Sequence, residues 1–265
     1  MTLVLLPPLG VPAGALAPLV APLSLHAPLL LHDLPGQGLA APSESTSLGH
    51  VAQWVLDGLD AMDVGRFDLC GFGFGGIVAL RLALDHGDRV DRLVVACASA
   101  APGNSDTYLT RARLVRENGL QEIAERTVRA WVTPAGLASR PALGHRLAAL
   151  LATCDAPTYA RHCEMLSTVE LSGSLRELSQ PTLVIAASED QGLPPAHSRR
   201  LASAIPEATL REIDRAAHLP WLEQPDAVAD AIVAHLVGRS VCAGDRKVAK
   251  ALQPLEVAQA FHQAG

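Results

Sequence analysis

The chain has 265 residues, of which 49% are hydrophobic, so it is long enough to bury a large core in one or two domains. Its formal net charge is −6 and it has no basic cluster, which argues against nucleic acid or an anionic membrane surface as a partner. The five cysteines show no C-x-x-C spacing, which favours reduced thiols in a cytoplasm over a disulfide framework or a zinc site.

The first thirty residues are apolar and contain no lysine or arginine. A membrane span needs about 20 unbroken apolar residues, but prolines from Pro7 to Pro28 interrupt this stretch repeatedly. A secretory signal needs a positive segment at its start, and the first basic residue is Arg66. We therefore predict a buried strand, a loop and a second strand here.

Short apolar runs bounded by turn signals alternate with runs of helical spacing along most of the chain. Strands are predicted over 2–6, 29–32, 67–70, 92–97, 182–186 and 209–213. Helices are predicted over 16–25, 47–62, 77–84, 196–204 and 226–237. This alternation predicts an α/β fold with a mostly parallel sheet of about six strands and helices on both faces.

The alternation stops between the fourth and fifth predicted strands. Residues 103–176 are helical in spacing, contain no strand-like run and are interrupted by Pro134, Pro141 and Pro157. We expect this segment to be a helical lid inserted into a core formed by residues 1–102 and 177–238. The tail, residues 239–265, is expected to be a short helix or disordered.

The segment Phe67–Gly76, FDLCGFGFGG, joins a strand to a helix through a glycine-rich turn. This is the layout of a nucleophile elbow, whose signature is G-x-S-x-G. Gly73 stands where the serine is expected, so the position of the nucleophile is vacant. The alternative is that Gly73 is simply a turn glycine, since elbows strain their central residue.

Two further candidates follow later strands. Asp190 comes after the fifth predicted strand and His218 after the sixth. Ligands of open parallel sheets bind beyond the carboxyl ends of the strands, and the order elbow, acid, histidine is that of the α/β-hydrolase triad. Each residue also has a plainer interpretation, a loop carboxylate for Asp190 and a structural histidine for His218.

Several motifs agree in order and spacing with one known family. They are DLPGQG, the elbow, HGDRVDRLVVA, the segment Thr153–Leu178, PTLVIAASED and AAHLPWLEQP. With them the chain resembles the α/β-hydrolase superfamily over about residues 2–237, and within it most the 3-oxoadipate enol-lactonases. The resemblance implies hydrolysis of a small carboxylic ester or enol-lactone in the breakdown of aromatic compounds. It implies no cofactor or metal, a small-molecule substrate and a cytoplasmic location.

The chain departs from the family pattern in two places. No strand hairpin precedes Thr2, and Pro7-Pro8 replaces the usual His-Gly pair after the first strand. By resemblance the backbone N–H groups of Leu9 and Phe74 form the oxyanion hole; Pro8 has no N–H, but Leu9 does. Trp131 and His162 are candidates for substrate contacts, or for packing residues of the lid. Cys70 points into the sheet and is a poor substitute nucleophile.

Three interpretations of the function stay open. The Asp190–His218 pair could act as general base in a non-covalent enzyme, as a hydrolase or as a lyase, isomerase or cyclase. The protein could instead be a ligand-binding protein that has lost its chemistry. It could finally be a hydrolase whose serine was replaced. The substrate and the oligomeric state also stay open.

Overall fold

A six-stranded sheet forms the centre of the protein in a computed structural model, which describes residues 1–238 of the chain. The predicted tail, residues 239–265, lies outside the described residues. The strand order is β2-β1-β3-β4-β5-β6, and every neighbouring pair is parallel. The strands are β1 (Thr2–Leu6), β2 (Leu29–Leu31), β3 (Phe67–Phe72), β4 (Val90–Ala96), β5 (Thr182–Ala187) and β6 (Thr209–Ile213). The predicted α/β fold with about six strands is confirmed, and the sheet is parallel throughout.

The central strands are continuous apolar runs because helices cover both faces of the sheet. Every residue of β3 and β5 is buried, and Leu3–Leu6 of β1 are fully buried. The edge strand β6 differs, since Thr209–Arg211 are exposed. The burial pattern therefore follows the position of each strand in the sheet.

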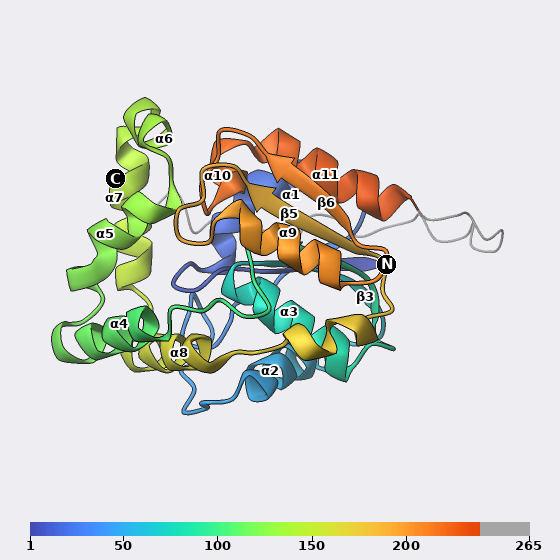
Figure 1. Cartoon of the computed structure of the whole chain (residues 1–265), viewed down its shortest axis with the longest axis horizontal. Helices are drawn as coiled ribbons and strands as arrows, with labels where there is room; N and C mark the ends of the chain where they lie inside the picture. The colour runs from blue at the N-terminus through green and yellow to red at the C-terminus, as the bar shows by residue number, and fades with distance from the viewer. Residues whose placement is uncertain (239–265) are drawn as a thin grey trace.

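Helices lie on the two faces of this sheet (Figure 1). On one side, α1 (Ala17–Ser24), which follows the short turn η1 (Ala13–Leu16), packs against α11 (Pro225–Val237). On the other side, α2 (Leu48–Asp60) packs against α3 (Phe74–Asp85). The 3-10 turn η2 (Ser172–Glu177) contacts both α3 and α9 (Pro195–Ala204).

Five helices separate β4 from β5 and lie beyond the carboxyl ends of the strands (Figure 1). They are α4 (Ser105–Asn118), α5 (Gln121–Trp131), α6 (Pro134–Ser139), α7 (Pro141–Ala152) and α8 (Ala156–Thr168). The three prolines of the segment stand in the first turns of α6, α7 and α8. A proline fits there because the first helical N–H groups have no partner within the helix. The segment is therefore helical, as predicted, and its separation from the core as a lid stays a proposal.

Trp221 connects the loop of His218 to β3, the strand that precedes the turn at Gly73. It is fully buried in α10 (Pro220–Glu223), directly after His218. Its ring centroid lies 4.6 Å from that of Phe72, and its indole N–H donates to the carbonyl of Ala15 at 2.9 Å. These contacts hold the loop of His218 against the end of β3.

Candidate active site

The sharp turn predicted between strand and helix is present at Gly73. β3 ends at Phe72 and α3 begins at Phe74, with Gly73 between them at φ +52° and ψ −118°. Residues other than glycine rarely adopt this backbone conformation, because their Cβ atom makes it strained; glycine tolerates it. The Gly73 N–H donates to the carbonyl of Ala96 at 2.8 Å, which fixes the turn against the neighbouring strand.

Gly75, a second glycine of the elbow motif, is explained by the close packing of the start of α3 against the end of β1 and the loop after it. A Cβ atom at Gly75 would lie 2.5 Å from the carbonyl oxygen of Pro7 and 2.7 Å from that of Leu6. Both are backbone atoms and cannot move aside cheaply. Only glycine at this position lets α3 start next to the loop that follows β1.

The space around Gly73 is narrow. A Cβ atom on Gly73 would lie 3.2 Å from Nε2 of His218 and 2.9 Å from Cβ of Pro8. The imidazole therefore faces the turn directly, and Pro8 closes the space from the other side.

The structure brings Asp190 and His218 together. Nδ1 of His218 lies 2.7 Å from Oδ2 of Asp190, and the Leu193 N–H donates to the other carboxylate oxygen at 2.8 Å. The Asp190 side chain is 1% exposed and that of His218 is 18% exposed. The carboxylate thereby orients the ring and leaves Nε2 toward Gly73. Burial alone would lower the pKa of His218, but the charge and hydrogen bond of Asp190 outweigh it and raise this pKa above its ordinary value of 6.5.

This raised pKa gives a pH profile for any reaction in which His218 is the base. A protonated imidazole accepts no proton, so kcat/KM is expected to rise with pH and to level off only above pH 6.5, where neutral His218 predominates. The measurement is kcat/KM for a small ester between acidic and mildly alkaline pH. An acid limb with its midpoint well below 6.5 would contradict this assignment.

Leu9 and Phe74, the residues predicted to supply the N–H groups of an oxyanion hole, line one cavity together with Gly73 and His218. Within residues 1–238, neither the N–H of Leu9 nor that of Phe74 donates a hydrogen bond. The loop carrying Leu9 is held by the buried Gln37, whose Oε1 accepts from the Gly10 N–H at 2.8 Å. The Gln37 amide also donates to the carbonyls of Pro8, at 3.1 Å, and Val11, at 2.9 Å. Both N–H groups are therefore available to a ligand.

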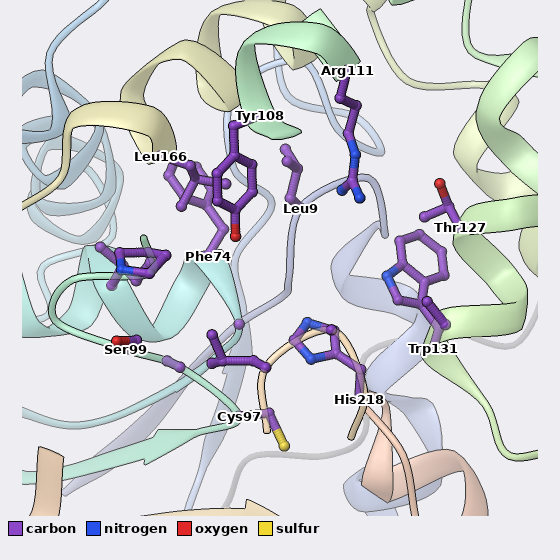
Figure 2. Close-up of a pocket in the computed structure, with 17 residues that line it drawn as sticks. Leu9, Phe74, Cys97, Ser99, Tyr108, Arg111, Thr127, Trp131, Leu166 and His218 are labelled. Carbon is purple, nitrogen blue, oxygen red and sulfur yellow. The ribbon is translucent and has the colours of Figure 1, made fainter. Parts of the chain in front are cut away.

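A cavity of about 100 Å³ joins these groups (Figure 2). Its apolar walls come from α3, from loops that follow the strands and from the helical segment: Leu9, Phe74, Ile77, Ala98, Pro102, Trp131, Leu166 and Leu193. Its polar lining comprises Ser99, Tyr108, Arg111, Thr127 and His218, beside Cys97. Cavities that combine apolar walls with a few polar groups are typical ligand sites.

Of the two candidate substrate contacts from the helical segment, Trp131 faces the cavity and His162 does not. Trp131 lines the cavity, and its carbonyl accepts from the Leu219 N–H at 3.0 Å, next to His218. His162 is buried behind Phe74, with ring centroids 4.7 Å apart, and is not among the lining residues. Burial lowers the pKa of His162 to about 4, so the ring is neutral.

Sequence reasoning missed two residues of the site. Gln37 belongs to the DLPGQG motif, but nothing in that motif alone indicates that its amide holds the Leu9 loop. Arg111 is one of several arginines in a helical segment, and its spacing does not reveal that it faces the cavity. Figure 2 shows it reaching from α4 toward the imidazole of His218.

Other chemistries find less support in residues 1–238. Burial raises the pKa of the Cys70 thiol, and likewise that of Cys97, so both are poor nucleophiles. No group of three or more His, Cys, Asp or Glu side chains in this part of the chain is placed to hold a metal ion. None of its helices is long and apolar enough to cross a membrane.

Comparison with known proteins agrees with the geometry. The chain is 30% identical to 3-oxoadipate enol-lactonase 2 of Acinetobacter baylyi over 78% of its own length and 77% of that protein. It is 27% identical to a pimeloyl-acyl-carrier-protein methyl ester esterase of Nitrosomonas europaea, over 73% of this chain and 79% of the esterase. The crystal structure of the enol-lactonase from Burkholderia xenovorans superposes with a TM-score of 0.86 at 27% identity, covering 89% and 91% of the two chains. The family model of the alpha/beta hydrolases matches residues 3–231. This chain therefore belongs to the alpha/beta hydrolase family.

Proposed function

We propose that the protein hydrolyses a small carboxylic ester or enol-lactone and that a water molecule, not a side chain, attacks the carbonyl. The observation that carries this proposal is the position of His218. Its Nε2 faces the vacant side of Gly73 in a cavity, while its Nδ1 is held by a buried carboxylate 2.7 Å away. A base in this arrangement needs only a bound water to become a hydrolytic catalyst.

The proposed reaction uses groups already in place. Nε2 of His218 removes a proton from water, and the resulting hydroxide adds to the carbonyl carbon. The N–H groups of Leu9 and Phe74 then donate to the oxyanion of the tetrahedral intermediate. When the carbon–oxygen bond to the leaving group breaks, the imidazolium returns the proton to that oxygen. The products are a carboxylic acid and an alcohol, or one open-chain acid from a lactone.

The relatives and the cavity support this substrate class. The similar proteins from Acinetobacter and Burkholderia are named enol-lactonases, and the one from Nitrosomonas an esterase. The cavity of about 100 Å³ is small beside the roughly 300–1,000 Å³ of typical ligand pockets. We therefore favour esters and lactones of a few carbon atoms. We also propose that residues 103–176 act as the lid that excludes bulk water from this cavity.

Pre-steady-state kinetics tests the proposal. We expect turnover of phenyl acetate and α-angelica lactone without a burst of product, because no covalent acyl-enzyme forms. Rapid-quench mass spectrometry of the intact protein is expected to find no acyl adduct. A stoichiometric burst with an acetyl group on a cavity residue, such as Ser99 or Thr127, would contradict attack by water.

A second candidate is a ligand-binding protein without turnover. The narrow space at Gly73, where Pro8 and His218 both approach the position of a Cβ atom, favours this alternative. It predicts saturable binding of small acids or lactones together with a rate of hydrolysis equal to that in buffer.

A further inference from the structure

Glu223 connects the loop of His218 to the helical segment. It is the last residue of α10 and is partly buried. Its Oε2 accepts from the Ala217 N–H at 2.9 Å, directly before the imidazole. Its Oε1 accepts from the Thr133 N–H at 3.1 Å and from the Thr133 hydroxyl at 2.5 Å. One carboxylate therefore bridges two segments that are far apart in the chain.

The hydroxyl of Thr133 has a defined direction in this bridge. Its oxygen caps α6 by accepting from the Gly136 N–H at 2.9 Å, which leaves its proton for the carboxylate of Glu223. An ionised carboxylate only accepts hydrogen bonds, and all three partners of Glu223 are donors. A hydrogen bond from a hydroxyl to a carboxylate is also charge-assisted, so it is stronger than one between neutral groups.

α6 leaves room for the carboxylate because residue 136 is glycine. A Cβ atom at Gly136 would overlap Oε1 of Glu223 and would lie 2.9 Å from Cγ1 of Val132. The end of a glutamate side chain can move aside, but here it would leave the two donors of Thr133. The bridge therefore depends on a residue of α6 as well as on the carboxylate itself.

A second hydrogen bond holds the loop of His218 from its other side. The Leu219 N–H donates to the carbonyl of Trp131, the last residue of α5, at 3.0 Å. The residues before and after His218 are thus both fixed to the junction between α5 and α6, residues 131–133. A shift of this junction would move the imidazole relative to Asp190, which lies only 2.7 Å away.

We propose that Glu223 is a positioning residue for His218 and that it makes the alignment of the base depend on the helical segment. Glu223 is not among the residues of the described chain that line the cavity, so it acts through the backbone of Ala217. With the bridge closed, Nδ1 of His218 stays on Asp190 and Nε2 faces Gly73. When the α5–α6 junction moves away, the loop loses its anchors. The proposal rests on the proposed function, which assigns the imidazole the role of base.

The titration of His218 tests the bridge without requiring turnover. NMR of the full chain gives its midpoint, and the spectrum of His218→Ala identifies its signal. We expect a midpoint above 6.5 in the parent chain, where Asp190 raises the pKa of His218, and a lower midpoint in Glu223→Gln. The amide would turn an N–H toward the donor of Ala217 or those of Thr133. One side of the bridge is then lost, and the imidazole moves away from Asp190.

Two variants displace the carboxylate and keep its charge. Thr133→Val removes the hydroxyl donor, and Gly136→Ala places a methyl group where Oε1 of Glu223 lies. We expect both to lower the midpoint of His218, and Thr133→Ser, which keeps the hydroxyl, to leave it as in the parent chain. Because Glu223 stays charged in all three, a lower midpoint reports a displaced imidazole and not a lost charge. Unchanged midpoints in Thr133→Val and Gly136→Ala would overturn the bridge.

Two controls accompany these variants. Asp226→Asn removes the charge of an exposed carboxylate three residues after Glu223 and is expected to leave the midpoint unchanged. A fall as large as that in Glu223→Gln would overturn the positioning role. The double variant Thr133→Val with Glu223→Gln is expected to lower the midpoint no further than Glu223→Gln alone, because both changes open one bridge. Fully additive effects would mean that the two residues act separately, which contradicts the proposal.

Kinetics separates positioning from stability. In Thr133→Val we expect kcat for a small ester to fall by about 10–10²-fold while KM changes little, because misplacement of a reacting group by about 1 Å has effects of this size. A lower Tm with unchanged kcat and midpoint would make Glu223 a structural contact only. Turnover in the parent chain with unchanged midpoints in the variants would overturn the bridge and leave the hydrolase. Lowered midpoints in a chain that hydrolyses no ester would overturn the hydrolase and leave the bridge.

Discussion

A variant that combines Gly73→Ser with Pro8→Gly is expected to hydrolyse phenyl acetate with a burst of phenol, on the order of 10³-fold faster than the parent chain. Loss of the triad serine in a known protease costs about 2 × 10⁶-fold in kcat, so a gain on the order of 10³-fold corresponds to restoring only part of that contribution. The remaining parts are in place here: the Asp190–His218 pair, the sharp turn, and the N–H groups of Leu9 and Phe74, which donate no hydrogen bond within residues 1–238.

Gly73→Ser alone is expected to gain much less. Its Cβ would lie 2.9 Å from Cβ of Pro8, closer than real Cβ contacts. Overpacking of this kind costs about 1–3 kcal/mol, which corresponds to roughly 5–150-fold in rate if it displaces the serine from His218. The burst amplitude and the steady-state rate of both variants measure the difference.

The choice of residue at position 8 provides the matched control. Pro8→Ala keeps the Cβ atom, so Gly73→Ser with Pro8→Ala is expected to behave like Gly73→Ser alone. Pro8→Gly without the serine is expected to show no burst and no 10³-fold gain, because it adds no side-chain nucleophile. If Gly73→Ser were as active alone as with Pro8→Gly, Pro8 would not obstruct the nucleophile position.

Removing the imidazole is expected to give the second large effect. His218→Ala should lower kcat for small esters by about 10²–10⁴-fold, the usual contribution of a general base. The physical reason is that, among the residues the structure describes, the cavity offers water no other base: Asp190 is not among its lining residues, and His218 is the only histidine among them. The rate is measured against the buffer reaction under identical conditions.

Two further variants separate the base from its surroundings. Asp190→Asn is expected to lose a comparable factor, because an amide N–H facing Nδ1 would force the other tautomer and occupy Nε2 with a proton. His197→Ala is the control, since this second histidine lies near Asp190 and its Nδ1 is 3.3 Å from the hydroxyl of Ser99. Equal losses in the His197 and His218 variants would contradict the assignment of the base.

The parallel sheet was predictable because its strands are buried on both faces and must be short apolar runs between turns. Boundaries moved by one to three residues: β4 begins at Val90, not at Arg92, and α3 begins at Phe74, not at Ile77. Serine is a preferred helix cap, and Ser47 does precede α2, but its side chain forms no capping hydrogen bond. Hydrophobic spacing specifies which face of a segment is buried, and it specifies the terminal hydrogen bonds much less well.

The candidate site was predictable in part for the same reason. Parallel strands end at one edge of the sheet, so residues that follow different strands, such as Gly73, Asp190 and His218, meet there although they are far apart in the chain. The separation of His218 Nε2 from Gly73 and the approach of Pro8 depend on how the loops pack. Neither distance is encoded in a local pattern.

The amino-acid sequence by itself determined the α/β fold, the turn that presents Gly73, and the pairing of an acid with a histidine, since each follows from local patterns and strand order. Only the tertiary structure decided the size of the cavity, the loop held by Gln37 and the direction of Arg111. These depend on where helices α4 and α5 lie against the sheet. Helix packing is fixed by side-chain contacts between distant segments, which helical spacing does not specify.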